Sequence, residues 1–386
     1  MKKIYVVFGL HAYQPPTQTK EIVEEIVEQS YGPLAELLLK SPAGTVACAD
    51  IPLSLIELLK KFGQKETITL IGECVKKGKI QLVNTAAYHP ILPLVPDEYA
   101  ERQLKLNLGA YADYFGVDPG SVKGIFPPEM AFSERILGPI KKSGAIWTIT
   151  DDKPFCSRHG TPPPHNEIIK RGGVAIFLMS HLWQPKIAFG EIPNGGDFLR
   201  ALENDFGGWA GSGDSYIVFW MDWETFGHHD RKPNPPQDRL NDFLKVFFEE
   251  IERSEVFRLT TPEKLMTRFP PKDIFVPDGS WSTSGDDCRR GIPYPLWLHP
   301  ENEFHQLMKH LSGLVLSLFH ETENGETKKL LDRCLYSCQM WQWSYGNREI
   351  AKKGLEIFKE IFSRKDVPDG IKREGWELVR RIENLP

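Results

Sequence analysis

Carboxyl and imidazole side chains, most of them near aromatic residues, occur in six short segments, each of which follows a run of β-branched or aromatic residues. Carboxyl groups can attack an electrophilic carbon or transfer a proton, and imidazoles can hydrogen-bond to hydroxyl groups. Aromatic rings can pack on the apolar face of a sugar ring. These residue types favour a polar, aromatic-walled cleft that suits the chemistry of a glycosidic bond. The segments are residues 11–15, 87–90, 127–129, 151–153, 180–183 and 222–229.

Glu129 and Asp222 are the candidate pair for this chemistry, because they follow two non-adjacent strands. Cleavage of a glycosidic bond with retention of the anomeric configuration requires two carboxyl groups about 5–5.5 Å apart. One acts as the nucleophile and the other as the acid/base. A single carboxylate after a strand is more often a structural hydrogen-bond acceptor or a loop cap. Polar groups at six strand ends together favour a site instead. Trp220, Trp223 and Phe226 could supply the apolar surroundings that keep Asp222 protonated.

Seven short strands alternate with amphipathic helices, which is typical of parallel strands joined by helices. This order predicts an α/β fold, a seven-stranded (β/α) TIM-like barrel followed by a C-terminal α-helical bundle. In such a barrel the functional groups lie on the loops after the C-terminal ends of the strands. Helices are expected over residues 22–39, 53–61 and 98–115, among others. The predicted strands are residues 4–10, 45–49, 80–85, 122–126, 145–150, 174–179 and 216–221.

The pattern changes near residue 270, and we expect three regions. A stretch rich in Gly, Ser, Pro and aromatic residues shows no clear period, and its Trp281 could fold over the cleft. Beyond it, Phe304, Leu307 and Leu311 begin an apolar stripe at helical spacing, which indicates a helical bundle. The regions are a (β/α)7 catalytic barrel over residues 1–270, an aromatic, glycine-rich loop over 271–299 and a C-terminal helical bundle over 300–386.

Five motifs occur in an order that resembles a known family over essentially the whole chain. The chain is similar to glycoside hydrolase family 57, whose enzymes act on α-glucans. One departure is Phe126, where many members have Trp. The motifs are His-x-x-Gln-Pro at 11–15, a segment from 78–83 running on to Tyr88-His89-Pro90, Gly-x-x-x-Pro-Glu at 124–129, Asp-x-Glu-x-Phe-Gly at 222–227 and Gln-Met-Trp-Gln-Trp at 339–343.

The resemblance implies a retaining, amylase-like glycosidase that acts on α-glucans or maltooligosaccharides. It implies Glu129 as the nucleophile, Asp222 as the acid/base and no metal or other cofactor for the chemistry. Strand-end position and resemblance together give the candidate substrate-binding residues. These are His11, Gln14, Tyr88, His89, Asp152, His181, Trp183, Glu224, Trp281, Trp341 and Trp343.

Composition excludes several other functions. The 47 basic and 52 acidic residues give a net charge of −5 without basic blocks, which argues against nucleic acid or a membrane surface as partner. No apolar run reaches the roughly 18 residues of a membrane span, and residues 1–10 lack a secretory pattern. The six cysteines are scattered and form no Cys-x-x-Cys pair, which favours a reduced, cytoplasmic protein. No oligomeric state is predicted.

Three alternatives stay open. A 4-α-glucanotransferase or branching enzyme would use the same two carboxyl groups. A non-catalytic carbohydrate-binding protein would keep the cleft without turnover. A metal-dependent polysaccharide deacetylase would need an Asp and two His ligands, and the Asp151-Asp152 pair after a strand suggests it. Only His305 and His310 come near the usual histidine spacing, and they fall in the predicted bundle.

Overall fold

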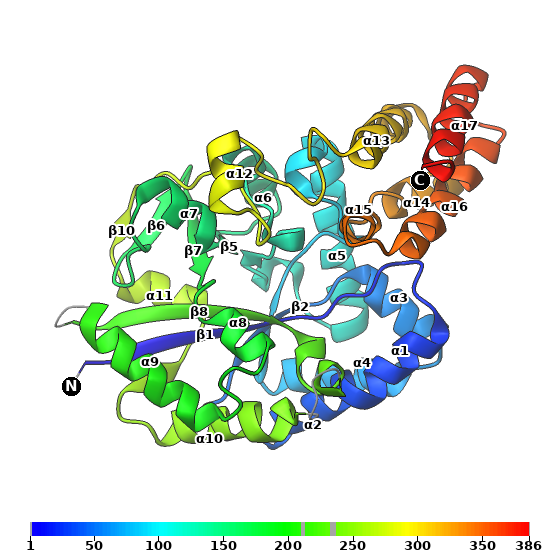
Figure 1. The fold of residues 1–386 in the computed structure, drawn as a ribbon. Coiled ribbons are helices and arrows are strands. Elements are labelled where there is room, and N and C mark those ends of the chain that lie inside the picture. Colours follow the sequence, from blue (N-terminus) through cyan, green and yellow to red (C-terminus); the bar gives the residue numbers. More distant parts are fainter. Residues whose placement is uncertain (1, 210–212, 232–236, 386) are drawn as a thin grey trace.

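The computed structural model describes residues 2–209, 213–231 and 237–385 (Figure 1). The long strand β1 (Ile4–His11) lies at the centre of the first sheet and pairs in parallel with β2 (Ala47–Asp50) and β8 (Ser215–Asp222). β3 (Ile80–Val83) continues the sheet beyond β2, and β9 (Phe257–Leu259) pairs with the first residues of β1. Because these strands are parallel, their C-terminal ends share one edge.

A second sheet has the order β10–β6–β7–β5–β4. Its strands are parallel except for the antiparallel pair β6 and β7. The two sheets also contact each other. An isolated bridge pairs Asn84 with Ile125, and the Ser180 N–H donates to the Val218 carbonyl over 3.0 Å. The strands are β4 (Gly124–Ile125), β5 (Trp147–Asp151), β6 (Ile168–Arg171), β7 (Val174–Met179) and β10 (Pro271–Lys272).

The expected α/β fold with parallel strands and a helical C-terminal part is confirmed. All seven predicted strands are present, but they are divided between two sheets rather than one continuous ladder. The sequence analysis missed β6, β9 and β10. For β6 a signal existed, because Gly172-Gly173 separates it from β7, and a Gly-Gly pair between two strands is typical of a hairpin turn.

Helices cover the outer face of the strands. α3 and α5 match their predictions closely, and the helix expected over residues 22–39 is present over residues 20–40 with a π-helical turn inside it. Residues 20–40 are helical without a break, and a π-helical turn at Val27–Tyr31 lies between α1 and α2, directly before Pro33, which lacks a backbone N–H. The helices are α1 (Lys20–Ile26), α2 (Gly32–Lys40), α3 (Leu53–Lys61), α4 (Lys65–Lys76), α5 (Asp97–Phe115), α6 (Leu137–Lys142), α7 (Asp152–His159), α8 (Gln184–Ala188), α9 (Gly195–Trp209), α10 (Val246–Arg253) and α11 (Pro262–Arg268).

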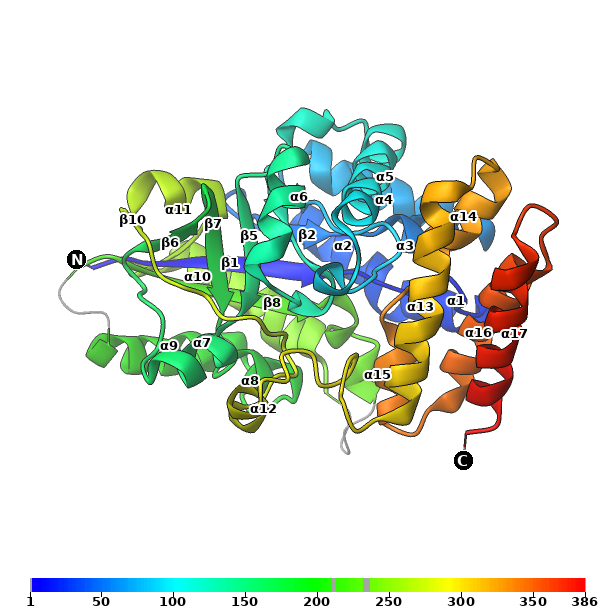
Figure 2. The same cartoon turned by 90° about the horizontal axis from the view of Figure 1, so that it is seen from above.

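The C-terminal part is helical and lies at one end of the sheets (Figure 2). The connecting segment contains the short helix α12 (Gly285–Arg290), which begins with a capping box between Ser284 and Asp287. None of the described helices is long and apolar enough to cross a membrane. The helices of this part are α13 (Glu303–Glu321), α14 (Gly325–Arg333), α15 (Cys338–Ser344), α16 (Arg348–Ser363) and α17 (Asp369–Glu383).

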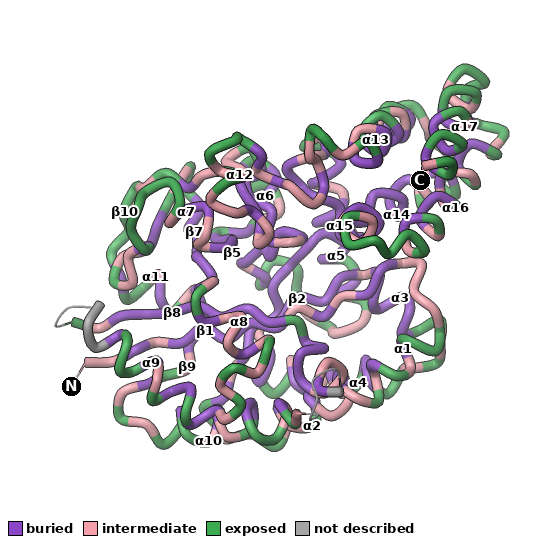
Figure 3. The backbone as a smooth tube through the Cα atoms, viewed as in Figure 1, coloured by how far each residue is buried: buried purple, intermediate pink, exposed green. Residues whose placement is uncertain are grey.

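Most residues of β1–β5, β7 and β8 are buried, whereas both residues of β10 are exposed (Figure 3). Side chains from both sheets form one core between them, with Trp147, Phe177 and Trp220 among the largest members. Close packing there requires a glycine on β1. A Cβ at Gly9 would lie 2.1 Å from the ring of Trp220, its partner on β8, whose indole donates to Asp50.

Gly9→Ala is therefore expected to destabilise the protein by about 1–3 kcal/mol, because an added methyl overpacks a filled core. Urea denaturation measures this free energy of unfolding. Gly109→Ala on α5 is the matched control, since a Cβ there meets nothing within 4 Å, and it should leave stability unchanged or raised. Equal stability of both variants would contradict the packing argument.

Candidate active site

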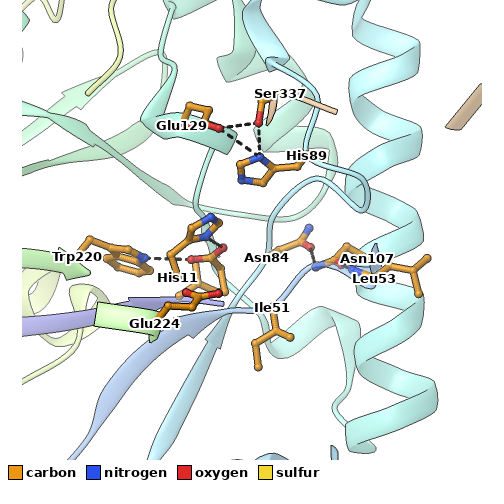
Figure 4. Close-up of polar contacts among 12 residues, drawn as sticks. His11, Ile51, Leu53, Asn84, His89, Asn107, Glu129, Trp220, Glu224 and Ser337 are labelled. Carbon is orange, nitrogen blue, oxygen red and sulfur yellow. Dashed lines mark hydrogen bonds and ion pairs between the residues drawn. The ribbon is translucent and has the colours of Figure 1, made fainter. Parts of the chain in front are cut away.

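The candidate site begins where β1, β2 and β8 end side by side. His11 is in register with Asp50 on β2 and with Asp222 on β8, so three titratable groups share one edge of the sheet. The Nδ1 atom of His11 lies 2.6 Å from Oδ2 of the fully buried Asp50. The other carboxylate oxygen of Asp50 accepts a 3.0 Å hydrogen bond from the Trp220 indole (Figure 4).

This arrangement keeps a positive charge on His11. Burial opposes charging of the ring, but the carboxylates of Asp50, Asp222 and Glu224 outweigh it and raise the pKa of His11 to about 9. His11 is therefore an imidazolium at neutral pH. Its charge balances a group of carboxylates that would otherwise repel one another.

Glu129 enters the site on a strained turn after β4. It adopts φ 59° and ψ 21°, a left-handed conformation that costs a non-glycine residue on the order of 1–3 kcal/mol. Both carboxylate oxygens are held in place. Ser337 Oγ donates to Oε1 over 2.6 Å, and Trp281 Nε1 donates to Oε2 over 2.7 Å. Burial raises the pKa of Glu129, while these two donors and the His11 charge act against the rise.

Ser337 is itself held by His89 (Figure 4). The His89 Nδ1 and Ser337 Oγ atoms are 2.8 Å apart, and the Ser337 N–H donates to the His89 carbonyl over 3.0 Å. Burial, with the nearby His11 charge, lowers the pKa of His89 well below its usual value, so its ring is neutral. Because the serine proton goes to the carboxylate, His89 Nδ1–H is the donor to Ser337. The ring also stacks on Tyr13, with 3.8 Å between centroids.

Glu224 lies two residues after Asp222 and is almost fully buried. Its Oε1 atom accepts hydrogen bonds from Gln14 Nε2, over 2.7 Å, and from the Tyr31 hydroxyl. The π-helical turn between α1 and α2 places Tyr31 there. Burial and the Asp222 charge raise the pKa of Glu224 to about 7.

Asp222 differs from these anchored groups. Asp222 is exposed at the end of β8, and within the described ranges its carboxylate has no hydrogen-bond partner. Displacement of water by surrounding protein raises the pKa of Asp222, and the His11 charge opposes the rise. Burial raises the pKa of both groups, but only Glu129 is fixed by two donors that favour its charged form, whereas Asp222 is accessible and lacks such donors in the described ranges. This arrangement can provide a nucleophile and a proton donor.

Asp152 and His181 lie at the ends of β5 and β7, in the second sheet. His181 Nδ1 is 2.9 Å from Asp151 Oδ2, and its backbone N–H donates to Asp152 Oδ1 over 3.1 Å. Burial beside Asp151 raises the pKa of Asp152 to about 7. Trp183, three residues after Ser180, is buried with its ring edge-on to Phe198.

Three other candidates make contacts with groups other than Glu129 and Asp222. The Tyr88 hydroxyl donates to Glu57 over 3.0 Å, in a cluster with Arg333. Trp343 stacks on Phe304 of α13 at 4.2 Å, with the Arg348 guanidinium 4.8 Å from its ring centroid, so these contacts engage its ring within the bundle. Trp341 packs edge-on to Tyr345. By contrast, Trp281 reaches Glu129 directly.

Three site residues were missed from the sequence. Asp50 ends the second strand, so the strand-end rule would have found it had it been applied there. Tyr31 depends on the π-helical turn. Ser337 lies 208 residues from Glu129 in the chain, and no local pattern identifies it.

Among the residues that the structure describes, no group of three or more His, Cys, Asp or Glu side chains could hold a metal ion. His305, one of the two histidines considered as ligands, is buried in the bundle. Its Nδ1 accepts from the His299 N–H, and its Nε2 lies 3.1 Å from Ser344 Oγ. The deacetylase alternative therefore lacks a ligand set in this part of the chain.

A family model described as glycosyl hydrolase family 57 matches residues 5–277, which places the chain in the glycosidase class. The chain belongs to glycosyl hydrolase family 57.

Curated relatives include an α-amylase of Pyrococcus horikoshii, 27% identical over 289 residues, which cover 73% of this chain and 43% of the relative. A 4-alpha-glucanotransferase of Thermococcus litoralis is 23% identical over 335 residues, covering 83% and 48%. The chain thus spans less than half the length of either relative. Among solved structures, a GH57-type branching enzyme of Pyrococcus horikoshii has a TM-score of 0.75 at 16% identity, covering 98% of this chain and 95% of that one, and shares its fold.

Ser337→Ala and Trp281→Phe each remove one donor to the Glu129 carboxylate. Donors stabilise the charged form, so their loss raises the pKa of Glu129. We expect the acidic limb of the pH–rate profile to move up by about 1 pH unit, because a hydrogen bond to a charged group contributes about 1.5–3 kcal/mol. Ser317→Ala, an exposed serine on α13, is the control. An unmoved acidic limb in both variants would contradict the assigned hydrogen bonds.

The raised pKa of His11 also predicts a pH-dependent stability. The unfolded ring titrates near 6.5 and the folded ring at about 9, so the stabilisation is complete below about pH 6.5 and lost as pH rises through 9. Relative to His11→Gln, the wild-type free energy of unfolding should fall by about 3 kcal/mol over this window. Urea denaturation at about pH 6 and about pH 10 measures it, with exposed His310→Gln as control. A constant difference would refute the ion pair.

Proposed function

We propose that this chain is a retaining α-glucan-active glycosidase, a hydrolase in the first place, with Glu129 as nucleophile and Asp222 as acid/base. The observation that carries the proposal is the contrast between the two carboxyl groups. Glu129 is fixed through both oxygens by two hydrogen-bond donors, and Asp222 is accessible and has no such donors in the described ranges. The family and the α-amylase and 4-alpha-glucanotransferase relatives support α-glucans as the substrate class.

In the first step a Glu129 oxygen attacks the anomeric carbon and forms a covalent glycosyl ester. The bond to the glycosidic oxygen breaks, and that oxygen takes the proton of Asp222, so the leaving sugar ends in a hydroxyl group. In the second step Asp222, now a carboxylate, takes a proton from water while the water oxygen attacks the anomeric carbon. This step releases Glu129 and restores the proton on Asp222.

The surrounding groups prepare these steps. Ser337 and Trp281 favour the ionised form of Glu129 and orient it, which limits the freedom it must lose on attack. The His11 imidazolium lies among the carboxylates and compensates charge as Asp222 gives up its proton. Gln14, His89 and Glu224 are proposed to contact sugar hydroxyls or to orient the groups that do.

We infer further that the two sheets act as one seven-stranded ring in the order β8, β1, β2, β3, β4, β5, β7. The Asn84–Ile125 bridge and the Ser180–Val218 hydrogen bond support this closure, as does the core shared by both sheets. In this arrangement residues 1–270 supply both carboxyl groups, residues 271–299 supply Trp281 and residues 300–386 supply Ser337.

Glucanotransfer is the second candidate, because a 4-alpha-glucanotransferase is among the relatives. It would use the same two carboxyl groups, with a sugar hydroxyl in place of water in the second step. The product profile from a maltooligosaccharide of single length separates the two. Only shorter products indicate hydrolysis, whereas shorter and longer products together indicate transfer.

Glu129→Gln is expected to lower turnover by about 10⁴-fold or more, because it removes the nucleophile, and Asp222→Asn by about 10²- to 10⁴-fold, because it removes the acid/base. Chromatography of the products measures this, and circular dichroism checks that the fold is kept. Asp369→Asn, whose side chain is 99% exposed on α17, is the control. Near-normal activity in either site variant would refute its role, and absence of products from the wild-type chain would refute α-glucan turnover.

A further inference from the structure

A second group of polar side chains lies at the same edge of the strands, away from Glu129 and Asp222. Asp151 is buried and fixes the imidazole of His181 through Nδ1, which leaves Nε2 as the ring's remaining polar atom. Asp152 accepts the His181 backbone N–H with one oxygen, Oδ1. Within the described ranges neither His181 Nε2 nor Asp152 Oδ2 has a hydrogen-bond partner. A donor or acceptor nitrogen and a carboxylate oxygen are thus both available next to one another.

These two residues line a cavity of about 490 Å³. Its other walls come from the start of α7, the segment 160–165 and α9, and they are largely apolar, with Pro162, Leu182 and Phe206 among them. Neither Glu129 nor Asp222 lines it. The volume falls in the range of small-molecule sites, about 300–1,000 Å³, which combine apolar walls with a few convergent polar groups.

The lining chemistry selects among ligand classes. Two acidic residues, Asp152 and Asp205, face one lysine, Lys153, which disfavours an anion. In the described part of the chain no three ligating side chains gather, which disfavours a metal ion. A neutral polyol fits instead, because adjacent hydroxyls can pair with an imidazole nitrogen and a carboxylate, and the C–H face of the ring can pack on the apolar wall.

The location connects this cavity with the catalytic residues. β7 and β8 run in the same direction, and the Ser180 N–H at the end of β7 donates to Val218 on β8. His181 and Asp222 therefore follow strands that end at the same edge. A chain of linked sugars crossing that edge can occupy both places at once.

We propose that this cavity is a second sugar-binding subsite, which takes a glucosyl unit of the α-glucan chain distant from the bond that is cleaved. His181 and Asp152 form hydrogen bonds with adjacent hydroxyl groups of that unit, and Asp151 orients His181. The proposal rests on the proposed function and deepens it. Its consequence is a preference for chains long enough to span from the catalytic carboxyl groups to this cavity.

The kinetic test uses maltotriose and maltoheptaose with three variants. His181→Gln removes the imidazole, and Thr161→Trp fills the cavity from an exposed loop position, so it can disrupt binding without touching the core. In both, kcat/KM for maltoheptaose should fall about tenfold more than kcat/KM for maltotriose, as expected for loss of one or two hydrogen bonds. His310→Gln, an exposed histidine on α13, should keep the wild-type ratio. Unchanged ratios in both cavity variants would overturn the subsite.

A direct binding measurement separates this proposal from the catalytic one. Histidine ring resonances of the Glu129→Gln protein are followed by NMR during titration with maltoheptaose, with the His181 signal assigned by its loss in His181→Gln. A saturable shift of that signal, abolished by Thr161→Trp, supports the subsite even if the wild-type chain yields no product. An unmoved His181 signal overturns the subsite even if the chain hydrolyses α-glucans.

Discussion

The positive charge on His11 is the constraint on which the candidate site depends. Asp50 at the end of β2 and Asp222 and Glu224 at the end of β8 converge on His11, and burial makes their mutual repulsion strong. The His11 imidazolium offsets that repulsion, and its position is fixed by the ion pair with Asp50. Asp50 is in turn fixed by the hydrogen bond from the Trp220 indole. Gly9 in turn leaves the space that the Trp220 ring needs. A glycine, an indole and an ion pair thus form one packed unit beneath the catalytic candidates.

The surroundings of Glu129 come from separate parts of the chain. Its left-handed backbone is unfavourable by itself and persists only because its surroundings determine it. Trp281 arrives on the segment between the strands and the helical part, and Ser337 stands directly before α15. The C-terminal helices therefore do more than cover the strands, since they supply a hydrogen bond to the proposed nucleophile.

The two sheets divide the polar groups into two sets. The first sheet carries His11, Asp50 and Asp222, whereas the second carries the Asp151–His181 pair beside a cavity. In each set a buried aspartate orients a histidine through Nδ1. The physical device is the same, but its result differs: His11 is enclosed by carboxylates and charged, and His181 borders open space.

Sequence alone determined which positions end strands, because hydrophobic period and β-branched runs are local properties. It thereby predicted that His11, Glu129 and Asp222 follow strands, and it predicted the helices over residues 53–61 and 98–115. Tertiary structure decided which side chains these residues contact. Ser337 meets Glu129 across 208 positions, Tyr31 depends on a π-helical turn, and Trp343 stacks within the bundle although its motif suggested the cleft. The reason is physical. The chemical type of a residue and the hydrophobic period of its neighbours are local properties of the sequence. The direction of a side chain and the group that it contacts depend on how distant elements pack.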